Sequence, residues 1–255
     1  MVNALQVTLV ANAGLLLEYN GAKLLLDGIF GKKGHPFSAP SPEMWQHMKE
    51  GRPPFDNIDY LLFTHAHPDH FSPEMTLEFL QSRRVKGLFL PEDEAVQQSG
   101  LTGYLQQERI SCAVLSNQTN HTGYRITPDI TVRAFRTLHL DKKFQSVPHF
   151  CYLITFGEKK ILFTADIDYV NEDLERIRSI RLDAAFVNPL LFGMLRRGRF
   201  LQCLPSAQRI VVYHVPFPPE DPMGMRPMLE RNLAQWPAEQ GMALALQEPF
   251  QQMQL

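Results

Sequence analysis

The chain has 255 residues, of which 44% are hydrophobic and 20% are charged, and its formal net charge is −2. This balance is that of a globular protein and excludes a disordered or fibrous chain. The near-neutral charge gives no general reason to expect nucleic acid or an anionic membrane as a partner. No uninterrupted apolar stretch approaches the length of a membrane span. We expect a single domain over residues 1–255.

The N-terminal part predicts a β-hairpin followed by a long loop. Two apolar runs in "GLLLEYNGAKLLLDG" are joined by Asn20-Gly21, a pair that tolerates the positive φ angles of a two-residue turn. The second run ends at Asp27. Residues 28–57 are rich in Gly and Pro, so we expect a loop with room for about one helical turn. A loop of this length is often a binding element or a lid.

A buried strand, predicted over Ile58–Thr64, runs directly into a cluster of polar residues. The stretch "HAHPDHF" then places three imidazoles and one carboxylate within six positions: His65, His67, Asp69 and His70. Ser72-Pro73 marks the start of a helix, because Ser is a good N-cap and Pro is favoured at the first helical position.

Further strands and helices are predicted in the rest of the chain. We expect a strand at Val85–Leu90, a strand "TVRAFRTLH" ending at His139, a hairpin turning near Gly157-Glu158 and ending at Asp166, a helix near Val170–Arg181, the strands "AAFVN" and "RIVVYH", the latter ending at His214, a helical region at about Pro222–Gln240, and a final strand "MALAL". This order predicts packed sheets with helices outside them.

Several candidate metal ligands lie at the ends of predicted strands. These residues are Asp27, His65, His139, Asp166 and His214. Imidazole and carboxylate together form the ligand set of zinc or iron. In an extended segment the side chains of residues i and i+2 point the same way, so His65 and His67 can share one metal. Asp69 and His70 can then face a neighbouring metal. The alternative is a polar loop that binds no metal.

The order of these motifs resembles the metallo-β-lactamase-fold superfamily. The motifs are "LLLDG", "THAHPDH", "FRTLHLD", "ILFTADID" and "VVYHVPF", and the resemblance covers about residues 5–246. It implies an α+β fold, a four-layer αββα sandwich with the metal site along one edge of the two sheets. Within the superfamily, the compact size is most similar to the ascorbate-phosphate-lactonase-like branch.

The resemblance also implies a ligand set for two divalent metal ions. It assigns His65, His67 and His139 to one ion, Asp69, His70 and His214 to the second, and Asp166 to a bridge between them. Asp27 would support the ligands from behind. Zinc is the expected metal, with Mn²⁺ or iron as alternatives.

Such a site favours hydrolysis. We expect a metal-bound hydroxide to attack a small ester, lactone, amide or phosphoester, with Asp69 as the catalytic residue that accepts a proton. Three alternatives stay open. They are a metal-dependent nuclease, an enzyme resembling the mononuclear-iron persulfide dioxygenases, and a metal-binding protein without turnover. Flavin-linked di-iron relatives carry Glu between the first two histidines, where this chain has Ala66.

Other residues are candidates for contact with a small, possibly anionic substrate. They are His35 in the long loop and the arginines of "LLFGMLRRGRF", namely Arg196, Arg197 and Arg199. The alternative is a solvated basic helix end. The three cysteines are odd in number and follow no motif spacing, which is typical of reduced thiols in a cytoplasmic protein.

Overall fold

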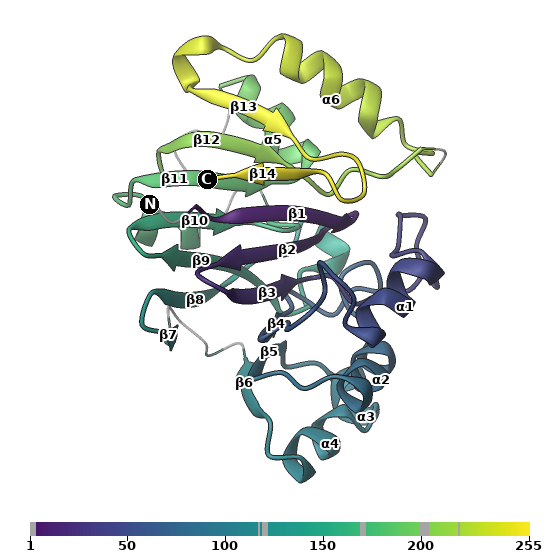
Figure 1. Cartoon of the computed structure of the whole chain (residues 1–255). Helices are drawn as coiled ribbons and strands as arrows, with labels where there is room; N and C mark the ends of the chain where they lie inside the picture. The colour runs from purple at the N-terminus through teal and green to yellow at the C-terminus, as the bar shows by residue number, and fades with distance from the viewer. Residues whose placement is uncertain (1–3, 117, 119–121, 169–171, 199–203, 219) are drawn as a thin grey trace. The chain divides into compact units, whose positions relative to one another are not determined.

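The structure is a computed structural model that describes the whole chain except residues 1–3, 117, 119–121, 169–171, 199–203 and 219. It divides into two compact units. Unit 1 comprises Met1–Ser116 with Glu248–Gln254, and unit 2 comprises Asn117–Gln247 with Leu255. Each unit contains one seven-stranded sheet (Figure 1).

Unit 1 is built on a mixed sheet. Its strands, in sheet order, are β14 (Gln252–Gln254), β1 (Gln6–Ala11), β2 (Gly14–Tyr19), β3 (Ala22–Leu26), β4 (Tyr60–Leu62), β5 (Gly87–Pro91) and β6 (Ser111–Leu115). The pairs from β14 to β3 are antiparallel, and those from β3 to β6 are parallel. Its helices are α1 (Pro42–Glu50), α2 (Pro73–Ser82), α3 (Glu94–Gln98) and α4 (Leu101–Gln107).

The predicted hairpin forms between β2 and β3. Asn20 and Gly21 have φ angles of 50° and 77°, as the turn chemistry requires. The register pairs Tyr19 with Ala22, so the apolar side chains of both strands enter the core in phase. This pairing delivers Asp27 directly after the last residue of β3.

The helix α2 begins as predicted. The side chain of Ser72 accepts a hydrogen bond from the Met75 amide, and Pro73 is the first helical residue. The loop predicted over residues 28–57 is corrected, because it contains the nine-residue helix α1. Ser41 caps its N-terminus, and Met44 and Met48 bury one face of it. The Gly and Pro content of this segment marks the helix ends and does not exclude a helix.

Unit 2 is built on a second mixed sheet. Its strands, in sheet order, are β13 (Met242–Ala245), β12 (Ala207–Val212), β11 (Leu182–Val187), β10 (Lys159–Phe163), β9 (His149–Phe156), β8 (Ile130–Thr137) and β7 (Thr122–Thr127). The pairs from β7 to β10 are antiparallel, and those from β10 to β13 are parallel. Its helices are α5 (Pro189–Arg196), α6 (Met225–Ala234) and three 3₁₀ segments, η1 (Lys142–Phe144), η2 (Glu172–Ile177) and η3 (Ala238–Gln240).

The helix predicted near Val170–Arg181 is also corrected. The described part of this segment is the 3₁₀ helix η2 and not an α-helix. Leu174 and Ile177 are its buried residues. Residues three apart lie on one face of a 3₁₀ helix, so this spacing buries both side chains without a longer helix.

Two mixed sheets with helices confirm the predicted α+β class. Among the described residues, none of the helices combines the length and the apolar character that a membrane span requires. Within each unit, strands that run in the same direction end at the same sheet edge. The predicted metal ligands follow such strand ends: β3 and β4 in unit 1, and β8, β10 and β12 in unit 2.

Candidate metal centre

The candidate ligands fall into two sets, one in each unit. The first donor set consists of His65, His67, Asp69 and His70, which follow β4 in unit 1. The second donor set consists of His139, Asp166 and His214, which follow β8, β10 and β12 in unit 2.

The carboxylate of Asp27 organises the first donor set from the end of the neighbouring strand β3. It is fully buried. Its Oδ1 accepts the Thr64 amide at 2.8 Å, and its Oδ2 accepts the Thr64 hydroxyl at 2.6 Å. Oδ2 also lies 2.9 Å from Nδ1 of His70. A carboxylate only accepts, so Nδ1 of His70 carries the proton and its Nε2 keeps a lone pair for a metal.

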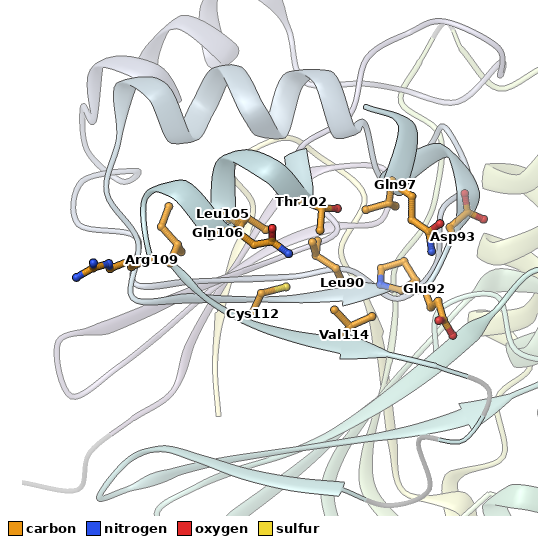
Figure 2. Close-up of a pocket in the computed structure, with 13 residues that line it drawn as sticks. Leu90, Glu92, Asp93, Gln97, Thr102, Leu105, Gln106, Arg109, Cys112 and Val114 are labelled. Carbon is orange, nitrogen blue, oxygen red and sulfur yellow. The ribbon is translucent and has the colours of Figure 1, made fainter. Parts of the chain in front are cut away.

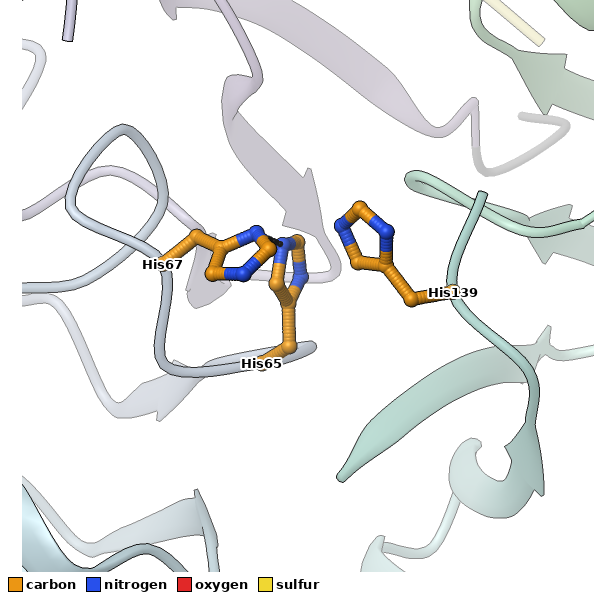
Figure 3. Close-up of side chains that lie close together, drawn as sticks. All are labelled: His65, His67 and His139. Atoms are coloured by element: carbon orange, nitrogen blue, oxygen red, sulfur yellow. Dashed lines mark hydrogen bonds between the residues drawn. The ribbon is translucent and has the colours of Figure 1, made fainter. Parts of the chain in front are cut away.

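The orientation of His65 follows from the same carboxylate. The one proton of the Thr64 hydroxyl is donated to Asp27, so Oγ1 of Thr64 must accept from Nδ1 of His65, 3.0 Å away. Nε2 of His65 is therefore unprotonated. It lies 3.1 Å from Nδ1 of His67, and the two rings meet edge to face (Figure 3). The two rings are neighbours, with centroids 4.7 Å apart.

Asp69 and His70 lie at the turn into α2. Nε2 of His70 is 3.7 Å from Oδ2 of Asp69. Asp69 is 6% exposed and His70 is fully buried. This pair thus places one imidazole nitrogen and one carboxylate oxygen close together, where both could bind the same metal ion.

The second donor set centres on the carboxylate of Asp166. Its Oδ2 is 3.7 Å from Nε2 of His139, and its Oδ1 is 3.5 Å from Nε2 of His214. Nδ1 of His139 lies against the carbonyl oxygen of Leu140, so this nitrogen is the protonated one and Nε2 keeps its lone pair. Each carboxylate oxygen faces a different histidine, which is the arrangement that a bridging ligand needs.

Three residues at these strand ends have left-handed backbone conformations. The φ angles of Asp27, Ala165 and His214 are 45°, 45° and 61°. A residue with a Cβ atom adopts this conformation only where its surroundings impose it, and such positions cluster at functional sites. Here the local bend turns the chain at the end of β3, β10 and β12.

Both donor sets fit divalent metal ions. In His65, His70 and His139 a partner on Nδ1 leaves Nε2 for a metal, and carboxylate oxygens lie close by. Zinc and iron prefer these atoms, and such partners on the far side of the ring fix the tautomer of a metal-ligating histidine.

The predicted substrate residues have local partners in the structure. Nε2 of His35 donates to the carbonyl oxygen of Gly31 at 2.6 Å, and its ring stacks with Phe37. Nε of Arg196 donates to Oδ1 of Asn232 at 2.8 Å, which ties α5 to α6. Arg197 is exposed at the end of α5.

Arg199 lies outside the described residues. Sequence reasoning did not identify Thr64 as a site residue, although it is the hydrogen-bonding link between Asp27 and His65. Its position directly before the first histidine was the only signal, and a Thr at the end of a strand is common for reasons of β-propensity alone.

A separate cavity of about 480 Å³ lies in unit 1 among β5, β6, α3 and α4 (Figure 2). None of its lining residues belongs to a donor set. Cys112 lines it, and burial raises the pKa of this thiol to about 11. A thiol with so high a pKa is a poor nucleophile and a poor ligand at neutral pH.

Residues 23–196, more than half of the chain, match the family model described as "Beta-lactamase superfamily domain". A relative in Streptomyces venezuelae, 4-amino-L-phenylalanyl-[CmlP-peptidyl-carrier-protein] 3-hydroxylase, is 27% identical over 161 residues. That match covers 62% of this chain and 28% of the relative. The matched segment therefore spans less than a third of that protein.

Two solved structures show the same fold over nearly the whole chain. Igni18, a metallo hydrolase from Ignicoccus hospitalis, is 16% identical with a TM-score of 0.61, covering 99% of this chain and 98% of that one. CmlA, a diiron β-hydroxylase from Streptomyces venezuelae, is 19% identical with a TM-score of 0.62, covering 99% of this chain and 54% of that one. These matches confirm the metallo-β-lactamase fold that the motifs predicted. The chain belongs to the β-lactamase superfamily.

Proposed function

We propose that the chain is a dinuclear metal-dependent hydrolase of a small ester, lactone, amide or phosphoester. The observation that carries this proposal is the orientation of the histidines. In His65, His70 and His139 a hydrogen bond on Nδ1 leaves the lone pair of Nε2 for a metal. A polar loop without a metal has no need for this arrangement.

In this proposal the two donor sets act together on two ions. His65, His67 and His139 would hold one ion, Asp69, His70 and His214 would hold the other, and Asp166 would serve both. Asp27 fixes the rings of His65, through Thr64, and of His70. The match to the β-lactamase superfamily supports the use of both sets in one site.

When bound, such ions would lower the pKa of a coordinated water towards neutrality and would polarise the oxygen of the scissile group. Asp69, whose carboxylate lies beside His70, would accept a proton from the attacking water, the role that the resemblance to the superfamily implies. Asp27 cannot take this role, since both its oxygens are engaged by Thr64 and His70.

Arg197 is our candidate for contact with an anionic substrate, because it is exposed and its side chain makes no hydrogen bond to another described residue. His35 remains a second candidate, because the residue is partly exposed. The proposed metal is zinc, and the proposed location is the cytoplasm, where the thiols of Cys112 and Cys151 stay reduced.

A second candidate function is oxygen-dependent hydroxylation at a di-iron centre. The relative at 27% identity is named as a hydroxylase, which favours testing iron against zinc. The same imidazole and carboxylate ligands suit both metals, so the donor atoms do not discriminate between the two reactions.

The test is to prepare the full chain without metal and load it separately with Zn²⁺ or Fe²⁺. Each form is assayed on esters, lactones, amides and phosphodiesters, and the iron form is also assayed for oxygen consumption with a reductant. The proposal expects hydrolysis by the zinc form, lost in His67→Ala and unchanged in Cys112→Ala. Oxygen consumption by the iron form without hydrolysis by either form would replace hydrolysis with the second candidate.

A further inference from the structure

The turn Thr164–Asp166, directly after β10, carries the central carboxylate of the second donor set. Thr164 and Ala165 are fully buried. Ala165 has a φ angle of 45°, a left-handed conformation that disfavours any residue with a Cβ atom. Something other than the intrinsic preference of this segment must therefore hold the turn.

All six backbone polar groups of the turn have partners. Two of these bonds are to the main chain: the Thr164 amide donates to Phe186 at 3.0 Å, and the Asp166 carbonyl accepts from the Leu140 amide at 2.6 Å. The other four are to buried side chains. The Ala165 amide donates to the Tyr213 hydroxyl at 3.2 Å, and the Asp166 amide donates to Nε2 of His149 at 3.1 Å. The Thr164 carbonyl accepts from the Cys151 thiol at 3.4 Å, and the Ala165 carbonyl accepts from Nδ2 of Asn188 at 2.9 Å. Side chains of β9 and of the residues that directly follow β11 and β12 thus surround one turn.

The Asp166 amide fixes the tautomer of His149. An amide only donates, so Nε2 of His149 is the acceptor and Nδ1 carries the proton. That proton is donated to the hydroxyl of Thr137, 2.7 Å away. His149 is fully buried. It is therefore committed as a neutral ring with one fixed orientation.

The single hydroxyl proton of Thr137 continues the same chain of hydrogen bonds. Its hydroxyl lies 3.5 Å from Sγ of Cys151, and that thiol donates to the Thr164 carbonyl at 3.4 Å. The bonds thus run from the Asp166 amide through His149, Thr137 and Cys151 back to Thr164. A closed chain of this kind ties the turn to β8 and β9 at both of its ends.

Tyr213 and Asn188 hold the middle of the turn. The hydroxyl of Tyr213, at the end of β12, accepts the Ala165 amide. The Nδ2 group of Asn188 donates to the Ala165 carbonyl, while its Oδ1 caps the first turn of α5. Tyr213 directly precedes His214, so the end of β12 supplies both a donor of the second set and a support for Asp166.

We propose that His149, Cys151, Asn188 and Tyr213 form a clamp that holds Ala165 in its left-handed conformation and presets the Asp166 carboxylate between His139 and His214. The four are positioning residues, because they touch the backbone that carries the ligand and not the ligand oxygens. The expected effect of these residues on metal binding rests on the proposed function. Their expected effect on the conformation of the turn is independent of that function.

Amide hydrogen exchange in the metal-free full chain tests the clamp directly. We expect the Ala165 amide to exchange at least about tenfold faster in Tyr213→Phe than in a control destabilised to a similar extent. Ile154→Val is that control, because Ile154 is a fully buried residue of β9 outside the clamp. Equal acceleration in both variants would overturn the role of the Tyr213 hydroxyl.

A matched pair at position 149 tests the acceptor. Gln can present an oxygen close to the position of Nε2, whereas Leu fills space without accepting a hydrogen bond. We expect His149→Gln to keep the Asp166 amide protected and His149→Leu to lose that protection. Equal protection in the two variants would contradict the assignment.

Zinc affinity, measured by competition with a chelator, tests whether the clamp acts on the ligand. We expect Tyr213→Phe and His149→Leu to weaken zinc binding about tenfold relative to Ile154→Val. Faster exchange of the turn amides with unchanged zinc affinity would contradict the proposal that the clamp positions the Asp166 carboxylate for metal binding. If the unmodified chain bound no zinc, the proposed function would fail, and the exchange experiments would still decide whether the clamp exists.

Discussion

The two donor sets are built in different ways. The first set lies in one stretch of six residues, and a single buried carboxylate, Asp27, orients two of its rings. The second set comes from three separate strands, and Asp166 depends on side chains from β9 and β12 and from the end of β11. The first set is thus encoded locally and the second by the topology of the sheet. A substitution of Asp27 or Thr64 should therefore alter the orientation of the histidine rings. A substitution of a side chain bonded to the turn at Asp166 should alter the backbone conformation of that turn.

The largest expected effect is that of His67→Ala. The variant removes one ligand from the local set, and the proposed site should lose metal and all measurable hydrolysis. Elemental analysis and an activity assay on the folded variant check this. A His67→Ala protein that retained two metals per chain would show that the ligand assignment is wrong.

Asp27→Ala should have the next largest effect, because one carboxylate supports two histidines. We expect about 100-fold weaker metal binding and a loss of about 3 kcal/mol in the free energy of unfolding, since the Thr64 amide, the Thr64 hydroxyl and Nδ1 of His70 lose their buried acceptor. Chelator competition and chemical denaturation measure the two quantities. Asp59→Asn is the control, because Asp59 lies in the same unit but pairs with the exposed Lys86. A normal metal affinity of the Asp27→Ala variant would show that Asp27 does not support the metal ligands.

Thr64→Val isolates one link of the local set. The change removes the hydroxyl between Asp27 and His65. It keeps the size of the side chain and the hydrogen bond from the residue 64 backbone amide to Asp27. We expect about tenfold weaker metal binding and a loss of about 1–2 kcal/mol in stability. Unlike Tyr213→Phe, it should leave the exchange of the Ala165 amide unchanged. An equal effect of Thr64→Val on that amide would break the distinction between the two sets.

The smallest effect is expected for Cys112, which belongs to neither set. Burial raises the pKa of its thiol from 9.0 to about 11, so the thiolate fraction at pH 8 is about 100-fold lower than for an ordinary thiol. We expect alkylation to be slowed by about this factor and to speed up as the pH rises towards 11. Cys112→Ala should change neither metal content nor hydrolysis. Rapid alkylation at pH 8 would contradict the burial of this thiol.

The parts of the structure that were predicted from the sequence are those with local chemical signals. Asn20-Gly21 specifies its turn through backbone conformation, and Ser72 begins α2 through its side chain. The histidines of the first set were found in the same way, because their spacing is itself the signal.

What the sequence did not reveal depends on contacts between distant segments. His149 and Tyr213 looked like ordinary strand residues, since their partners at Asp166 and Ala165 become neighbours only when β9, β10 and β12 are in register. The helix α1 is longer than the single helical turn predicted, because the Gly and Pro content of its segment indicated a loop.

In the proposed function both donor sets serve one pair of metal ions. Elemental analysis of the purified protein, made in cells supplied with both zinc and iron, counts the metal atoms per chain. We expect close to two atoms per chain, mainly zinc. No metal after reconstitution with zinc or iron would contradict this expectation, and a single iron per chain would contradict the dinuclear hydrolase.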